Sequence, residues 1–156
     1  MDWLHGEVTV STDPQRLDMP LIHRFLSEDS YWARGVPRAV VEKSVRHSLC
    51  FGVYRHDRQI GFARVVTDFA VFGHLMDVFI VPEERGKGLS KLLLGCIMAH
   101  PELQGFRLWQ LGTKDAHGLY TQFGFRPLAE PERSMEIRDA EVYSRVSGRR
   151  TAGSGT

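Results

Sequence analysis

A chain of 156 residues has the usual length of a single folded domain. Apolar residues make up 42% of it and charged residues 25%, which allows a buried core and excludes an intrinsically disordered composition. Twenty basic and nineteen acidic residues leave a formal charge of +1, so the composition favours neither nucleic acid nor a membrane surface as a partner.

The sequence carries no signal for export or for membrane insertion. Residues 1–7 lack a basic stretch followed by an apolar run, and no segment approaches the roughly 18 apolar residues of a membrane span. We therefore expect a cytoplasmic protein. Cys50 and Cys96 lie in apolar stretches without CxxC spacing, so we expect two buried free thiols. None of the seven histidines stands in a ligand spacing such as HExxH, and no metal site is expected.

Alternation and helical periodicity divide the first half of the chain into short elements. In chain order they predict a strand at residues 7–11, a helix after Asp18, a second helix beginning at Pro37, a β-hairpin of residues 49–54 and 59–67, and a strand at 75–81. This last strand is almost wholly apolar, which favours a central position with both faces covered.

One amphipathic helix dominates the second half. Its apolar residues recur at helical spacing from Gly88 until Pro101 ends the run. Beyond it the sequence predicts a strand at residues 106–111, a helix at 115–122, and final strands at 125–128 and 134–137. We expect one domain at residues 1–143 and a mobile tail at 144–156, because the tail offers almost no apolar anchor.

A glycine-rich turn at residues 81–90 joins the apolar strand to this helix. Gly86 and Gly88 let the backbone curl, so that the amide hydrogens of the first helical turn and the helix dipole suit a bound phosphate. Arg85 and Lys87 add positive charge. Neither GxxxxGK[ST] nor GxGxxG is present, which disfavours a nucleoside triphosphate or NAD. A basic surface turn that only caps the helix is the alternative.

This segment resembles the pyrophosphate-binding signature of the GNAT superfamily of N-acetyltransferases, which is Arg or Gln, two residues, Gly, one residue, then Gly or Ala. Arg85, Gly88 and Ser90 stand in those places, and Ser90 departs from the pattern. The resemblance implies that acetyl-CoA contacts Arg85, Gly86, Lys87, Gly88, Leu89 and Ser90.

A second signature of the same family follows downstream. Residues 116–125 resemble the family's segment in which Ala and Tyr lie on a helix that ends in Gly-Phe. Thr113 stands where many members have an Asn that contacts the cofactor. The resemblance extends from about residue 51 to residue 125, and the N-terminal helices match the family only loosely.

The resemblance also implies the chemistry, in which an amine attacks the thioester of acetyl-CoA directly and coenzyme A departs as a thiolate. Backbone amides of Val78, Phe79 and Ile80 would pair with the pantetheine arm. Tyr120 is the candidate general acid, because a tyrosine hydroxyl, with a pKa of about 10, can return a proton to a thiolate whose thiol has a pKa of about 8.5. The alternative for Tyr120 is an aromatic residue of the core.

An ammonium acceptor must lose a proton before it attacks, so a base should lie near the acceptor nitrogen. Asp77 is the first candidate because it is an acidic residue in an apolar strand, where an unpaired carboxylate is costly. The alternative for Asp77 is a charge at the strand end that reaches water or pairs with a nearby arginine. His117 and Asp115 are weaker candidates, since the alternative for residues beside Tyr120 on a short predicted helix is a solvated side chain.

The acceptor pocket in this superfamily is usually built from the N-terminal helices and the strand after them. Tyr31, Trp32 and Arg34 lie there, and they can hold a ring, a cation or a carboxylate. The alternative is that the two aromatic residues close the core between helices.

The sequence thus predicts an α/β domain of the GNAT fold, with a mixed, mostly antiparallel twisted sheet flanked by helices. It predicts an N-acetyltransferase that moves an acetyl group from acetyl-CoA to an amine of a small molecule or peptide, as a monomer or a homodimer. A noncatalytic acyl-CoA-binding sensor is the alternative, and turnover distinguishes the two.

Overall fold

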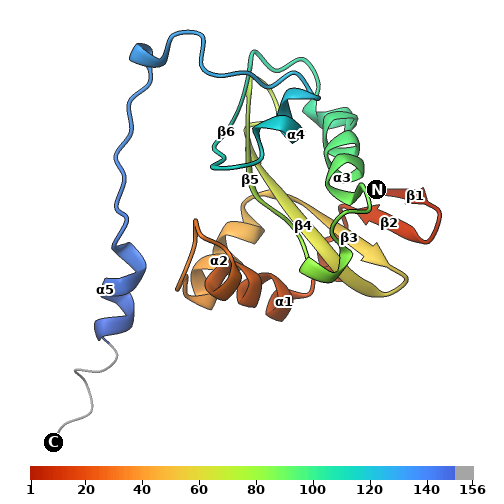
Figure 1. Ribbon diagram of the computed structural model, residues 1–156, viewed down its shortest axis with the longest axis horizontal. Coiled ribbons are helices and arrows are strands. Elements are labelled where there is room, and N and C mark those ends of the chain that lie inside the picture. The colour runs from red at the N-terminus through yellow and green to blue at the C-terminus, as the bar shows by residue number, and fades with distance from the viewer. Residues whose placement is uncertain (150–156) are drawn as a thin grey trace, which may run out of the picture. The chain divides into compact units, whose positions relative to one another are not determined.

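The computed structural model describes residues 1–149 (Figure 1), with side chains as far as residue 146. Its internal contacts divide the chain into two compact units. The first contains residues 1–18 and 44–126, and the second contains residues 19–43 together with the described residues from Pro127 to residue 149.

The first unit is built on one six-stranded sheet, in which the strands lie side by side in chain order. They are β1 (Asp2–His5), β2 (Val8–Ser11), β3 (Leu49–Arg55), β4 (Arg58–Thr67), β5 (Phe72–Ile80) and β6 (Leu108–Leu111). Every neighbouring pair is antiparallel except β5 and β6, which are parallel. The expected mixed, mostly antiparallel sheet is confirmed.

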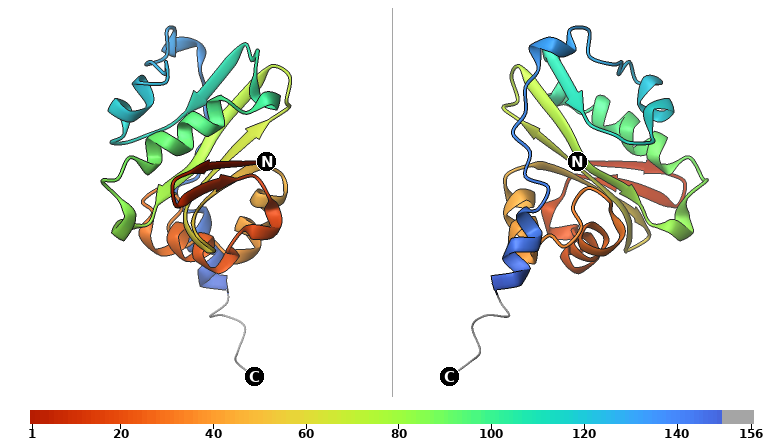
Figure 2. Two further views of the ribbon diagram at one scale, coloured as in Figure 1. Left: turned by 90° about the vertical axis from the view of Figure 1, so that its right-hand side faces the viewer. Right: turned by 60° about the vertical axis from the view of Figure 1, so that its left-hand side comes forward.

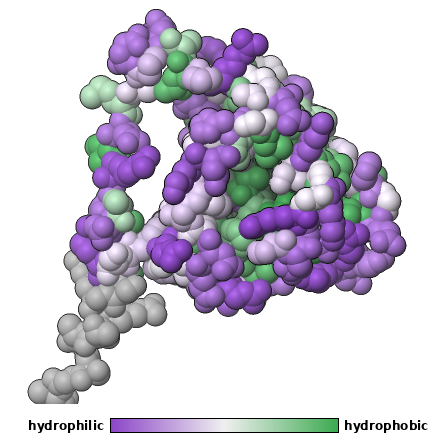
Figure 3. Space-filling view, in the orientation of Figure 1, coloured by the Kyte–Doolittle hydropathy of each residue, from purple (hydrophilic) through white to green (hydrophobic). Residues whose placement is uncertain are grey.

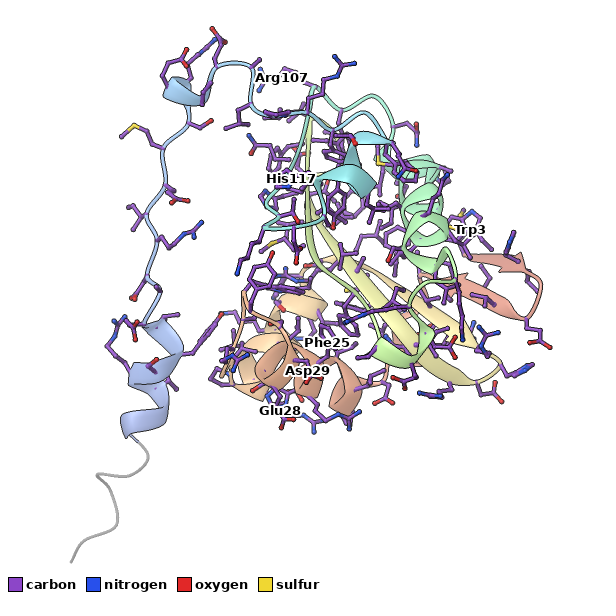
Figure 4. All side chains as sticks on the ribbon, in the orientation of Figure 1. Trp3, Phe25, Glu28, Asp29, Arg107 and His117 are labelled. Carbon is purple, nitrogen blue, oxygen red and sulfur yellow. The ribbon has the colours of Figure 1, made fainter. Side chains whose placement is uncertain are left out.

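Helix α3 (Leu89–Met98) lies across one face of this sheet and packs on β3 and β5 (Figure 2). Its buried side chains, Leu93, Leu94 and Ile97 among them, join a core of fully buried strand residues. Removing each such side chain from water stabilises the fold by about 1.5 to 3 kcal/mol. Trp3 of β1 lies beside α3 (Figure 4), where its ring is 6.0 Å from that of His100. Helix α4 (His117–Thr121) follows β6.

A β-bulge interrupts the ladder between β4 and β5. Phe62 pairs with Phe79 and Arg64 pairs with Met76. One residue of β4, Ala63, therefore stands opposite two residues of β5, Asp77 and Val78. Asp77 lies in the bulge with a φ of 55°, a left-handed conformation that Asp tolerates better than most residues. The bulge thus changes the course of β5 at Asp77.

The second unit contains short helices. They are α1 (Met19–Arg24), a π-helical turn (Phe25–Asp29), the start of α2 (Arg38–Arg46) and α5 (Val142–Arg149). The Ser30 amide donates to the Phe25 carbonyl at 2.9 Å, which closes the wider π turn. The two helices expected before the hairpin are therefore present.

The final strands expected at residues 125–128 and 134–137 are wrong. In the described chain these residues form no strand, and a 3₁₀ turn (Pro131–Arg133) lies between them. An alternating segment becomes a strand only when another strand accepts its backbone hydrogen bonds, and Met135 and Ile137 are 98% and 104% exposed. Residues 144–149 of the expected tail belong to α5, and residues 150–156 lie outside the described residues.

Both cysteines are free and buried, as expected. Burial raises the pKa of the Cys50 thiol to about 12 and also raises that of Cys96. No helix within the described residues is long and apolar enough to cross a membrane.

Candidate functional site

The parallel pairing of β5 and β6 at the edge of the sheet ends near the bulge. Their ladder joins residues 72–75 of β5 to residues 108–111 of β6, and β6 then ends. Strand β5 continues to Ile80, so beyond Leu75 it has no strand neighbour on that side in the described chain. Backbone groups of Val78 to Ile80 are thereby placed beside a gap between strands, as the pantetheine role expected for them requires.

The glycine-rich turn follows directly on β5. The first hydrogen bond of α3 joins the Leu92 amide to the Gly88 carbonyl at 3.0 Å, so the amides of residues 89–91 precede the helical ladder. Gly86 and Gly88 have φ angles of 76° and 77°, and a Cβ on either would meet nothing within 4 Å. The turn is open to a ligand, and its backbone conformation favours glycine at both positions.

Buried Glu84 braces this turn. Its carboxylate accepts hydrogen bonds from Arg55, at 2.9 and 3.2 Å, and from Lys87 Nζ at 3.0 Å. Arg55 first, then Lys87, lowers the pKa of Glu84 to about 2. Arg85 Nε donates to the Ile80 carbonyl at 3.0 Å and so ties the turn to the end of β5. The basic residues expected to attract phosphate also hold the turn in shape.

Helix α4 follows β6, whose last residue, Leu111, pairs with Leu75 of β5. Thr113 Oγ1 accepts a hydrogen bond from the Ala116 amide at 3.0 Å and shapes the approach to the helix. Tyr120 is 8% exposed, and its ring packs edge-on against Phe125 with centroids 6.1 Å apart. Thr113 and Tyr120 thus both lie after the end of β6 in the first unit.

Asp77 forms an ion pair that sequence reasoning did not specify. Arg64 Nε donates to Asp77 Oδ2 at 2.5 Å, and Arg64 Nη1 donates to Ser48 Oγ at 3.2 Å. The two charged side chains are only 12% and 7% exposed. The alternative held open for Asp77, pairing with an arginine, is what the structure shows. An arginine within the apolar strand β4 was the signal that could have indicated it.

His74 of β5 is a second residue that sequence reasoning missed. Its side chain is half-buried, and burial, followed by the charge of Arg64, lowers its pKa below the usual value of 6.5. A neutral imidazole is therefore the main form at neutral pH. The weaker candidates His117 and Asp115 are exposed, and His117 lies on α4 beside β6 (Figure 4).

The candidate acceptor residues belong to the second unit. Ser30 Oγ donates to the Leu26 carbonyl at 2.6 Å and accepts from the Ala33 amide at 3.1 Å, which fixes the turn that carries Tyr31 and Trp32. The two rings meet edge-on at 5.0 Å and are 51% and 42% exposed. Arg34 is exposed as well. Aromatic surface is thus available to a ligand here.

Apolar residues are concentrated on one part of the surface. The face drawn in Figure 3 is hydrophilic along its margins, and its apolar residues gather over the middle of β4 and β5. Within the described residues, no group of three or more His, Cys, Asp or Glu side chains is placed to hold a metal ion.

Residues 46–127, more than half of the chain, match the family model described as an acetyltransferase (GNAT) domain. The chain belongs to this family. The matched residues contain strands β3 to β6, including the parallel pair, and the glycine-rich turn before α3.

Relatives agree with the GNAT assignment. An inferred acetyltransferase of Gibberella zeae is 31% identical over 152 residues, which cover 83% of this chain and 85% of that protein. A crystal structure of a protein of Xanthomonas campestris pv. campestris, assigned to the GNAT family, is 50% identical with a TM-score of 0.87, over 90% of this chain and 99% of that one.

A more distant structure shows the fold alone. A predicted acetyltransferase of Clostridium acetobutylicum, crystallised with acetyl-CoA, is 13% identical with a TM-score of 0.61. The superposition covers 84% of this chain and 96% of that one.

Proposed function

We propose that this GNAT protein transfers an acetyl group from acetyl-CoA to an amine of a small molecule or a peptide. The observation that carries the proposal is the stretch of β5 beyond Leu75, which has no strand beside it on the β6 side in the described chain, followed by a turn whose two glycines leave open space. The extended pantetheine arm of acetyl-CoA fits beside this stretch of β5, and the diphosphate of acetyl-CoA fits the turn. Acetyl-CoA, the donor of the family, supplies the acetyl group as a reactive thioester.

Each part of the site has a separate task. The amides of residues 89–91 donate hydrogen bonds to the diphosphate, with the helix dipole adding to the attraction. Backbone groups of Val78, Phe79 and Ile80 pair with the pantetheine arm, which orients the thioester without any particular side chain. Thr113 accepts a hydrogen bond from the Ala116 amide just before α4. Helix α4 carries Tyr120, whose hydroxyl is assigned to the sulfur.

Two protons must move for the transfer to finish. Tyr120 donates its hydroxyl proton to the departing sulfur and regains one afterwards. The acceptor amine loses its proton to a base at the bulge, for which Asp77 is the candidate from sequence. His74 is a second candidate, because its neutral imidazole on the same strand is able to accept a proton.

A thiol-release assay tests this proposal. Acetyl-CoA is offered with polyamines, amino acids, aminoglycosides, arylamines and peptides, and the released thiol is measured against a blank without enzyme. The buried cysteines should add little background. Binding of acetyl-CoA without release of thiol for any amine would favour the noncatalytic sensor instead.

Gly88→Val is expected to abolish the thermal stabilisation that acetyl-CoA gives the wild type. The added side chain projects into the open space where the diphosphate approaches, and a β-branched residue resists a φ of 77°. Bound ligand raises Tm by mass action, so thermal melts with and without acetyl-CoA measure the effect.

Gly105→Val is the matched control for backbone strain. Gly105 has a φ of 75° and equally open surroundings, but it lies outside the turn. Both variants should melt at lower temperatures than wild type, and only the Gly88 variant should lose the response to acetyl-CoA. An undiminished response in Gly88→Val would remove the turn from the site.

Trp32→Ala is expected to raise the acceptor KM while leaving acetyl-CoA affinity nearly unchanged. The ring is 42% exposed, so its loss removes contact area for a ligand more than core packing. Steady-state kinetics and calorimetry with acetyl-CoA separate the two. Phe69→Ala, which removes another half-exposed aromatic ring, is the control. Equal loss of both affinities and of stability would make Trp32 a structural residue.

A further inference from the structure

Strands β3, β4 and β5 carry a polar group of side chains on the sheet face opposite α3. The ring of Phe51 meets those of Trp3 and His100 on the α3 face, and neighbouring strand residues alternate between faces, so Cys50 points to the other side. Cys50 pairs with Arg64, and directly paired residues share a face. Arg64 therefore lies on the face away from α3.

Arg64 is held in place by two contacts. Nε donates to Asp77 at 2.5 Å and Nη1 donates to Ser48 Oγ at 3.2 Å, and both partners lie in the first unit. These contacts restrain the guanidinium, although it stands at the end of a long and flexible side chain. A ligand that binds it loses little side-chain entropy.

The guanidinium still has N–H groups to offer. An arginine has five donors, and the two contacts use two of them, with no further partner for Arg64 among the described residues. The Tyr54 hydroxyl is the only fully buried side-chain polar atom without a partner in the described part of the chain. Nη2 of Arg64, which neither contact uses, is therefore not fully buried, although the side chain as a whole is 12% exposed.

The position of Arg64 relates these donors to the reaction. Arg64 pairs with Met76, which lies between the end of the β5–β6 ladder and the bulge at Asp77. The diphosphate turn leads into α3, whereas Arg64 faces away from α3. Its donors are thus placed for the acceptor and not for the phosphates of the cofactor.

We propose that Arg64 binds an anionic group, a carboxylate or a phosphate, on the amine acceptor, and that Asp77 and Ser48 position it. This inference rests on the proposed function. The planar Nη1–Nη2 edge suits two acceptor oxygens, and Asp77 occupies the separate Nε side. Asp77 offsets the charge of Arg64, so the selectivity comes from oriented donors more than from net charge.

Matched acceptor pairs test this inference. Amino acids are compared with their carboxamides, and phosphoethanolamine is compared with ethanolamine, so the two arms distinguish a carboxylate from a phosphate. The wild type should favour the anionic member of at least one pair by about 10- to 100-fold, in kcat/KM by thiol release and in binding by calorimetry with coenzyme A present. Arg64→Gln should abolish this preference, and Arg64→Lys should restore part of it.

Two further variants guard against misfolding and charge effects. Arg64→Gln with Asp77→Asn removes both buried charges, so it should fold even if Arg64→Gln does not, and it too should lose the preference. Loss of a base would slow both members of a pair equally and leave their ratio unchanged. Arg58→Gln removes an exposed positive charge from the same strand and should keep the preference.

The outcomes separate this inference from the proposed function. If acetyl-CoA binds but no amine is acetylated, the proposed function fails, and the calorimetric arm alone decides the role of Arg64. A wild type without preference in binding, including one that binds neither member of either pair, overturns the role of Arg64. A preference that persists in both Arg64→Gln variants overturns it as well.

Discussion

Tyr120→Phe is expected to lower kcat by about 10²- to 10⁴-fold while acetyl-CoA binding stays close to that of the wild type. The substitution removes one hydroxyl and almost no volume, and the edge-on packing against Phe125 is kept. A hydroxyl that protonates the departing sulfur acts in the transition state, so its loss should appear in kcat and not in affinity. Single-turnover kinetics measures the chemical step apart from product release.

Tyr54→Phe is the matched control. Tyr54 is also buried, at 1% exposed, and its hydroxyl makes no hydrogen bond within the described residues. Removing that hydroxyl should leave kcat unchanged and should not destabilise the fold, since no partner is left unsatisfied. A wild-type rate of chemistry in Tyr120→Phe would make Tyr120 structural and leave the acid unidentified.

The sequence was most informative where local chemistry alone determines structure. The hairpin of β3 and β4, the helix after Gly88 and the turn at residues 85–90 follow from alternation, periodicity and glycine, all of which are local. These elements also carry the proposed cofactor contacts. The turn proposed to bind phosphate could therefore be located from the sequence.

What was missed depends on pairing between distant segments. The ion pair of Asp77 requires β4 and β5 to be in a particular register, and the bulge that sets this register has no local signal. The same holds for β1, which becomes a strand because it pairs with β2. Residues 134–137 alternate as well, yet no strand partner is present for them in the described chain, so they form no strand.

The charge of Asp77 also has a consequence for stability. Arg64 and Asp77 are 12% and 7% exposed, so both charges have been largely removed from water. Such a pair adds little net stability compared with apolar residues, but removing one partner leaves the other charge buried and uncompensated. The bulge adds a second demand, because a residue other than Gly, Asn or Asp is strained at a φ of 55°.

Asp77→Ala is therefore expected to lower the free energy of unfolding by about 3 to 5 kcal/mol, measured by urea denaturation. Replacing Arg64 by Met together with Asp77 by Asn should cost much less, since neither charge remains and Asn tolerates the left-handed conformation. Glu83→Ala is the control, because it breaks an exposed ion pair in which the Arg58 side chain is 61% exposed and the Glu83 side chain 56%. It should lower the free energy of unfolding by at most about 1 kcal/mol. If Asp77→Ala were no more destabilising than Glu83→Ala, the Arg64–Asp77 pair would be solvated in solution, and Arg64 would lose the support that its proposed role requires.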